Sequence, residues 1–198
     1  MKDETISLRW HPYKMFPYET KLAYREINTL LKSDVYKNDK DQVIVCNPQN
    51  IDNASRLVFF SEIDYKGRII PTKQKLIETT ERKNFKRQNT RYSVHGLHEY
   101  KGKFNPQIVK VLFNIFSVDE NSLVLDPFCG SGTSLVEAAL NNIKAKGTDI
   151  NPLAVFIANT KIAALNLTCK DLSDGKKTFF ERYEQVSVDL ELKEDTDR

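Results

Sequence analysis

The stretch DPFCGSGTS at residues 126–134 places an acidic residue, two glycines and small hydroxyl residues close together. The apolar run SLVL at 122–125 comes before it and predicts a short buried strand that ends at Asp126. A loop containing Gly130 and Gly132 and a helix beginning near Thr133 are expected to follow. A glycine loop between a strand and a helix lets a ligand approach the backbone, so this stretch predicts a ligand-binding loop.

The residues around the glycines discriminate among three ligand classes. A triphosphate loop needs Lys after its last glycine, whereas Gly132 is followed by Thr133. A dinucleotide loop has a third glycine where this chain has Leu135, and it holds a pyrophosphate that Asp126 would repel. A carboxylate at the strand end suits a cationic ligand instead. S-adenosylmethionine, which carries a sulfonium and an ammonium group, therefore fits this loop best.

A second carboxylate, Asp149, ends the next predicted strand at 145–149, 23 residues after Asp126. In nucleotide-binding α/β folds an acidic residue near this offset accepts hydrogen bonds from a ribose. We therefore expect Asp126 and Asp149 at adjacent strand ends, on either side of the donor. The alternative is that Gly130 and Gly132 form an ordinary tight connection and that Asp149 is a surface strand end.

Helices and strands alternate around this loop. Asn105 and Pro106 predict the start of a helix that runs to about Ser117, and Asn151 and Pro152 predict the start of another. Between them lie the strand at 122–125, a helix at 134–142 and the strand at 145–149. The helix at 134–142 is expected to turn four apolar residues inward: Leu135, Ala138, Ala139 and Leu140. This order predicts an α/β fold with a parallel sheet and helices on both faces.

The chain is expected to have three parts. Residues 1–90 predict a small α+β accessory region, with a helix at 17–31 and β-rich runs at 42–46 and 56–60. Residues 91–170 form the α/β portion. Residues 171–198 contain one helix at about 178–186 and an acidic tail.

Charge is unevenly distributed. Residues 1–118 carry 21 basic and 13 acidic side chains, whereas residues 119–198 carry 9 and 14. Residues 66–110 carry 12 basic and 3 acidic side chains with aromatic residues interleaved, which favours either a nucleic-acid surface or an ordinary solvated face. The widely spaced Cys46, Cys129 and Cys169 indicate neither disulfides nor a metal site. Without a membrane-spanning run or a signal peptide, a cytoplasmic location is expected.

Three motifs together resemble a known family. DPFCGSGTSLVEA followed by GTDINPLA resembles the cofactor-binding segment of DNA methyltransferases that modify the exocyclic amine of cytosine (N4) or adenine (N6). HGLHEYKGKFNPQI at 95–108 resembles the segment that precedes it in a mostly cytosine-N4 subgroup. The resemblance covers about residues 90–165 and implies a Rossmann-like fold, of which this chain holds the first half of the sheet. It also implies S-adenosylmethionine as cofactor and double-stranded DNA as substrate, in a restriction-modification context.

The resemblance assigns cofactor-binding roles by position. Asp149 would hold the ribose and Ile150 would lie against the adenine. Lys103 and Phe104 would close the other side of the pocket, although Lys103 could be a solvated charge and Phe104 a core ring. The residues expected to line the methionine end are Asp126, Pro127, Phe128, Gly130 and Gly132.

One motif of this family is missing. An Asp, Asn or Ser followed by two prolines and an aromatic residue holds the target amine in the family, and no two prolines are adjacent here. No catalytic residue is therefore predicted, and the target-amine portion is expected in a second subunit or to have been lost by truncation. The alternatives are a protein similar to tRNA guanine-N2 methyltransferases, or an inactive DNA-binding remnant of a restriction-modification system.

Overall fold

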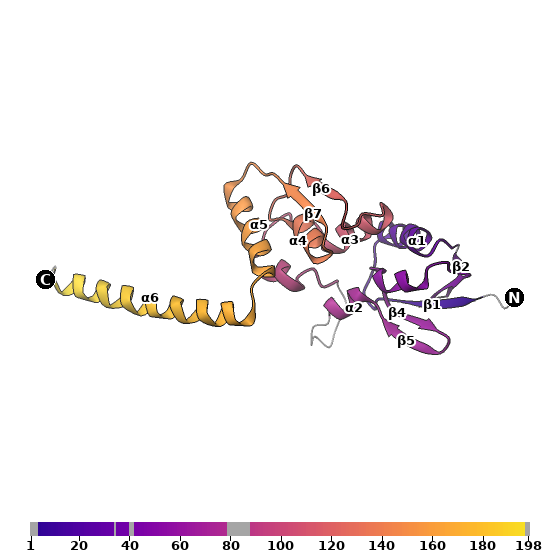
Figure 1. Ribbon diagram of the computed structural model, residues 1–198, viewed down its shortest axis with the longest axis horizontal. Helices are drawn as coiled ribbons and strands as arrows, with labels where there is room; N and C mark the ends of the chain where they lie inside the picture. The colour runs from indigo at the N-terminus through magenta and orange to yellow at the C-terminus, as the bar shows by residue number, and fades with distance from the viewer. Residues whose placement is uncertain (1–3, 34, 40–41, 79–87, 197–198) are drawn as a thin grey trace. The chain divides into compact units, whose positions relative to one another are not determined.

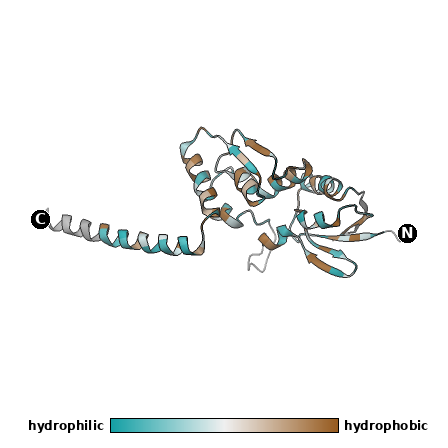
Figure 2. Ribbon diagram, viewed as in Figure 1, coloured by the Kyte–Doolittle hydropathy of each residue, from teal (hydrophilic) through white to brown (hydrophobic). Residues whose placement is uncertain are grey.

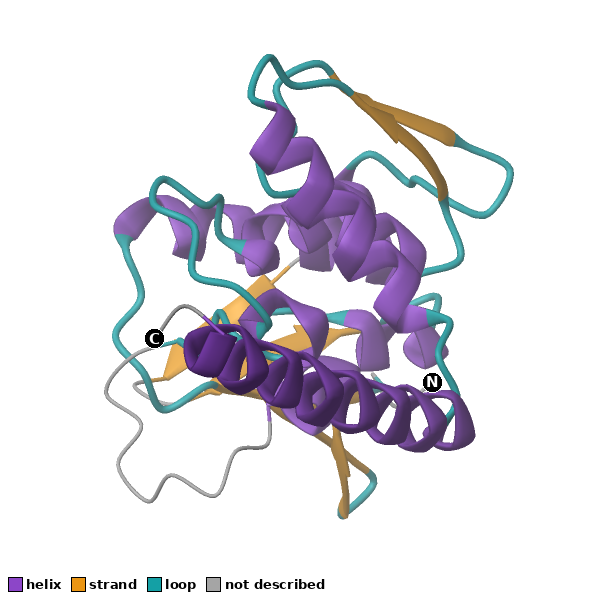
Figure 3. Cartoon of the chain, turned by 90° about the vertical axis from the view of Figure 1, so that its left-hand side faces the viewer, coloured by secondary structure: helices purple, strands orange, loops and turns teal. Residues whose placement is uncertain are grey.

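A computed structural model describes residues 4–33, 35–39, 42–78 and 88–196 (Figure 1). Contacts divide the chain into two compact units, residues 1–162 and 163–198. In the first unit, helices lie between a five-stranded antiparallel sheet and a two-stranded parallel sheet (Figure 3). The described chain is therefore a mixed α/β protein.

The antiparallel sheet has the strand order β2-β3-β1-β4-β5. The predicted strand at 42–46 is confirmed as β3, but the predicted strand at 56–60 is wrong. Residues 51–56 form a short 3-10 helix, η1, and the fully buried residues 57–59 form an irregular segment before β4. The strands are β1 (Thr5–Trp10), β2 (Val35–Asp39), β3 (Gln42–Cys46), β4 (Phe60–Tyr65) and β5 (Arg68–Pro71).

Helix α1 (Pro17–Leu31) has the predicted bounds. Its first turn is stabilised by the Glu19 carboxylate, which accepts a hydrogen bond from the Phe16 amide at 2.7 Å. Ile27 and Leu31 on its inner face share one core with residues of β1, β3 and β4 and with Val111 of helix α3 (Pro106–Ile115). The accessory region and α3 are thus packed together and do not have separate cores.

Helix α3 is the central element because it packs on both sides. It begins as predicted, since the Asn105 side chain accepts a hydrogen bond from the Gln107 amide at 3.0 Å. Val109 and Phe113 face away from the main core into a smaller core. That smaller core joins α3 to α4 (Thr133–Leu140), β6 (Leu123–Asp126) and β7 (Lys144–Gly147).

The predicted burial of the 122–125 strand is wrong for one face of β6. Leu123 and Leu125 are 62% and 67% exposed, and they stand in register beside Lys144 and Lys146 of β7. Val124 points to the other face and packs on the smaller core. Leu140, which was expected to turn inward, is also exposed. Among the described residues, the parallel pair is therefore covered on one face, and the prediction of helices on both faces is not met.

The remaining elements are short or peripheral. Helix α2 spans Lys73–Glu78 and the 3-10 helix η2 spans Ser93–Gly96. Helix α5 (Pro152–Leu165) begins at the predicted proline. Helix α6 (Cys169–Thr196) is much longer than the helix predicted at about 178–186. The part of α6 that is coloured in Figure 2 is mostly hydrophilic with short hydrophobic bands. None of the helices in the described part of the chain combines the length and apolar character that crossing a membrane requires.

Candidate functional site

The two carboxylates singled out from the sequence lie at the same edge of the parallel sheet. Asp126, the last residue of β6, is in register with Gly147, the last residue of β7. The pairing continues past the strand ends, because the Thr148 amide donates to the Asp126 carbonyl at 3.0 Å. Asp149 follows directly, so both acidic side chains project from adjacent strand ends, as the sequence predicts.

The glycine loop is tied to the second carboxylate. The Gly130 amide donates to Asp149 Oδ2 at 2.8 Å, and the Asn151 amide donates to Asp149 Oδ1 at 2.9 Å. Asp126 Oδ1 accepts a bond from the Phe128 amide at 3.1 Å. Each carboxylate oxygen can accept more than one hydrogen bond, so both side chains retain acceptor capacity for a ligand. None of the ion pairs found among the described residues includes either carboxylate.

Gly130 and Gly132 differ in what surrounds them. Both have positive φ, +50° and +79°. A Cβ added to Gly132 would lie 2.7 Å from the Cβ of Ala158 in α5, so this glycine permits close packing of the loop on the helix. A Cβ added to Gly130 would have one neighbour within 4 Å, the Tyr100 ring at 3.6 Å. Gly132 therefore serves packing, while Gly130 lies on the more open side of the loop.

Two apolar side chains beside the carboxylates are open to solvent. Phe128 is 87% exposed and Ile150 is fully exposed. Pro127 between Asp126 and Phe128 is also exposed. An apolar ring could therefore lie against Ile150 next to the Asp149 carboxylate.

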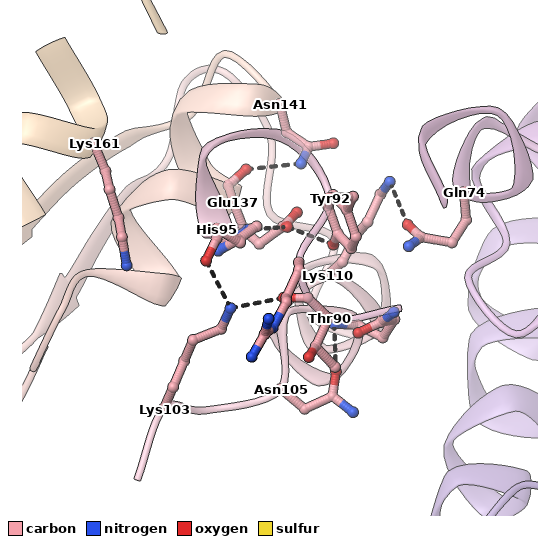
Figure 4. A network of polar contacts seen from close by, with 12 residues as sticks. Gln74, Thr90, Tyr92, His95, Lys103, Asn105, Lys110, Glu137, Asn141 and Lys161 are labelled. Atoms are coloured by element: carbon pink, nitrogen blue, oxygen red, sulfur yellow. Dashed lines mark hydrogen bonds and ion pairs between the residues drawn. The ribbon is translucent and has the colours of Figure 1, made fainter. Parts of the chain in front are cut away.

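Lys103 and Phe104 line an open cavity of about 290 Å³ formed by residues 90–105. The Lys103 ammonium donates to the Thr90 carbonyl at 2.7 Å and to the His95 carbonyl at 3.1 Å (Figure 4). Burial, with repulsion from Lys161 and Arg91, lowers the pKa of Lys103 to about 8. Lys103 thus links the backbone at Thr90 to the backbone at His95 within the cavity wall, and it is not a solvated charge. Phe104 is 55% exposed and is not a core ring.

The cavity and the glycine loop adjoin each other. Tyr100 lines the cavity and is also the nearest neighbour of a Cβ built on Gly130. The structure therefore brings the predicted residues at 103–104 and at 126–132 into one neighbourhood.

Sequence reasoning missed two buried charges that contact this neighbourhood. Glu137 of α4 accepts a hydrogen bond from the Tyr92 hydroxyl (Figure 4). Lys161 of α5 donates to the carbonyl and the hydroxyl of Ser131, both at 3.2 Å. Burial lowers the pKa of Lys161. An isolated charge within an apolar helix, as in SLVEAAL and FIANTKIAAL, is the signal that could have identified them.

The basic region at 66–110 is only partly a surface. Residues 79–87, which hold four of its basic side chains, lie outside the described residues. Lys103 and Lys110 are turned inward, and the Lys110 ammonium donates to Gln74 Oε1 at 2.9 Å. The described part of the chain contains no group of three His, Cys, Asp or Glu side chains that could hold a metal.

The comparisons with known proteins decide the family. A family model described as DNA methylase, of the N6/N4 type, matches residues 9–160. This chain belongs to the N6/N4 DNA methylase family. The match starts near the end of β1, so the family segment includes strands β2–β5 of the antiparallel sheet as well as the glycine loop.

Several proteins resemble shorter stretches of this family member. The chain is 46% identical over 70 residues to the type II methyltransferase M.MjaII of Methanocaldococcus jannaschii, covering 35% of this chain and 13% of that protein. It is 30% identical over 128 residues to the type II methyltransferase M.MvaI of Kocuria varians, covering 64% and 23%. It is 36% identical over 52 residues to a tRNA (guanine(10)-N2)-dimethyltransferase of Methanothermobacter thermautotrophicus, covering 26% and 16%. Each match spans less than a quarter of the relative's length.

Proposed function

We propose that this chain binds S-adenosylmethionine at the β6–β7 edge and is the donor-binding part of a DNA methyltransferase that modifies an exocyclic base amine. One observation carries the proposal: Asp126, the Gly130 amide and Asp149 meet at one sheet edge in a member of the N6/N4 DNA methylase family. Cytosine N4 is favoured over adenine N6, because HGLHEYKGKF resembles a mostly cytosine-N4 subgroup.

The residues at this edge fit the chemistry of the donor. Carboxylates at both strand ends suit a ligand with positive charge and a ribose diol, and Asp149 retains acceptor capacity for that diol. Ile150 is free to lie against the adenine, and Asp126, Pro127 and Phe128 would flank the methionine end together with Gly130 and Gly132. The bound donor supplies the methyl group. Lys103 and Phe104 would close the pocket from the neighbouring cavity.

We further propose that β6 and β7 are the first half of a Rossmann-like sheet and that the target-amine motif lies outside this sequence, in a complementing portion or a second subunit. No two prolines are adjacent in the sequence. The exposed face that carries Leu123 and Leu125 supports this proposal, because parallel sheets are normally covered on both faces.

Double-stranded DNA is the proposed substrate. A base must leave the stack to reach the donor, so a basic surface is expected along the DNA backbone near the flipped nucleotide. Lys73, Arg91 and Lys101 are exposed and belong to the basic region. Lys103 and Lys110 are turned inward and are not part of this surface.

Calorimetric titration with S-adenosylmethionine tests the donor site. Asp149→Asn removes a charge and is expected to weaken binding about 10- to 100-fold, since it impairs charge-assisted hydrogen bonds. Asp174→Asn, at an exposed position in α6, is the matched control and should bind as the unaltered chain does. Equal affinities of the two variants would refute the pocket assignment. Methyl transfer to duplex DNA by the chain alone would refute the proposal that the target-amine motif lies outside this sequence.

A second candidate is methylation of guanine N2 in tRNA, favoured by the similarity to the tRNA dimethyltransferase. RNA is usually recognised by its shape and its 2′-hydroxyls. Retention of the chain on duplex DNA and on tRNA at two salt concentrations separates the candidates. Stronger and less salt-sensitive retention on tRNA would favour the second one.

A further inference from the structure

Glu137 is a buried carboxylate that joins two segments far apart in the sequence. It lies in α4 and is 1% exposed. Its Oε1 accepts a hydrogen bond from the Tyr92 hydroxyl at 2.6 Å and lies 2.9 Å from His95 Nε2 (Figure 4). Tyr92 and His95 are also buried, at η2. A buried carboxylate without hydrogen-bond donors is energetically costly. Moving Tyr92 and His95 away from Glu137 is therefore unfavourable.

The surroundings of His95 define how it pairs. Among the described residues, its Nδ1 atom is buried and has no hydrogen-bond partner. With hydrogen on Nε2, the ring donates to Glu137 Oε1 and leaves Nδ1 as an acceptor without a partner. Donation from His95 to Glu137 is therefore the favoured arrangement.

A chain of hydrogen bonds connects His95 to Lys103 in the cavity wall. The His95 carbonyl accepts from Lys103, which also bonds the Thr90 carbonyl. Lys103 and Phe104 line the cavity next to the glycine loop. On its other side, Glu137 is one helical turn beyond Thr133, where α4 leaves that loop. Both walls of the candidate pocket are thus anchored to the same side chain.

We propose that Glu137 is a positioning residue that locks the 90–104 wall onto α4 and so sets the geometry of the donor pocket. The proposal rests on the proposed function. Glu137 acts through His95 and Lys103 and needs no contact with the donor. Residue 137 must then supply an acceptor oxygen, and its negative charge is secondary.

Two substitutions separate this role from a purely packing role. Glu137→Leu keeps a similar volume but leaves Tyr92 and His95 without an acceptor. If the wall is then ordered about a tenth of the time, the apparent Kd for S-adenosylmethionine rises about 10-fold. Glu137→Gln keeps an oxygen at the acceptor position and should restore affinity to within about 3-fold. Equal losses in the two variants would overturn the proposal.

A double substitution tests the path through Lys103. If Glu137 acts through this residue, Glu137→Leu combined with Lys103→Met weakens binding no more than the worse single variant does, whereas independent roles give multiplied losses. Multiplied losses would contradict the proposal. Tyr92→Phe, which removes one donor and keeps the ring, replaces Glu137→Leu if that variant does not fold, and should weaken binding by a smaller factor.

Hydrogen exchange gives a readout that does not depend on the donor. Amides of residues 90–104 should exchange faster in Glu137→Leu than in the unaltered chain, and Glu181→Gln in α6 should leave them unchanged. Unchanged exchange of these amides in Glu137→Leu would overturn the proposal that Glu137 holds residues 90–104 against α4. A chain that shows the exchange difference but never binds S-adenosylmethionine would refute the proposed function and leave the lock intact.

Discussion

Replacing Gly132 with alanine tests whether the glycine loop is held by close packing on α5. The new Cβ would lie 2.7 Å from the Cβ of Ala158 and 3.2 Å from its Cα, closer than van der Waals contact allows. The positive φ of +79° adds strain of about 1–2 kcal/mol for a residue with a Cβ. Overpacking adds about 1–3 kcal/mol. Together the two effects predict that Gly132→Ala lowers the free energy of unfolding by about 2–5 kcal/mol.

Gly130→Ala is the matched control in the same loop. Its φ is also positive, at +50°, but its Cβ would approach only the Tyr100 ring, at an ordinary 3.6 Å. It should therefore cost about 1–2 kcal/mol, the backbone strain alone.

Urea unfolding followed by far-ultraviolet circular dichroism measures both losses. Ala158→Gly should partly rescue Gly132→Ala, because it removes the closest contact, although glycine within α5 itself costs about 1 kcal/mol. The expected coupling in the double-mutant cycle is about 1–3 kcal/mol in the stabilising direction. A Gly132→Ala loss no larger than that of Gly130→Ala, or strictly additive effects with Ala158→Gly, would refute this account of the loop.

Three further perturbations have defined outcomes. Burial raises the pKa of Glu26 to about 8, so its contribution to stability is complete at low pH and is lost as pH rises through the folded-state pKa. Between pH of about 4.5 and 8 the free energy of unfolding should fall by up to about 1.4 kcal/mol per pH unit in urea titrations, and Glu26→Gln should flatten that slope. Lys161→Met removes the ammonium that donates to Ser131, so it leaves two acceptors without this donor and should lower the free energy of unfolding by about 1–3 kcal/mol. It should also weaken S-adenosylmethionine binding in calorimetry, because it releases Ser131; unchanged binding would contradict this. Leu125→Glu, on the exposed face of β6, should leave the thermal midpoint nearly unchanged, whereas Val124→Glu, on the opposite face, should lower it sharply; equal shifts would contradict the one-sided burial.

The parts of the fold that were predictable depend on local signals. Pro17, Asn105 and Pro152 mark helix starts by fixing φ or by capping free amides, and each acts within one turn of chain. The irregular segment before β4 was not predictable in this way. Leu57 and Phe59 are fully buried, and an apolar run indicates burial without specifying the backbone conformation.

The candidate site shows the same division. Asp126 and Asp149 each follow a short strand, and parallel pairing of two consecutive strands brings their ends together. Glu137 could be noticed as a charge in an apolar helix, but its partners lie more than 40 residues away in the sequence. A contact at that separation is set by the packing of α3, α4 and η2, which no local pattern encodes.

Where sequence and structure disagree about β6, the disagreement is informative. The run SLVL has the continuous apolar character of a strand buried on both faces, yet Leu123 and Leu125 are exposed. Leucines at alternate positions of an exposed face bring no benefit to solubility, and the neighbouring Lys144 and Lys146 leave the apolar strip uncovered. The apolar sequence and the exposed face are reconciled if further protein covers this face in the active enzyme. The same strand therefore supports the proposal that the target-amine portion packs against β6 from outside these residues, since in the proposed enzyme that portion would also lie close to the donor proposed at the β6–β7 edge.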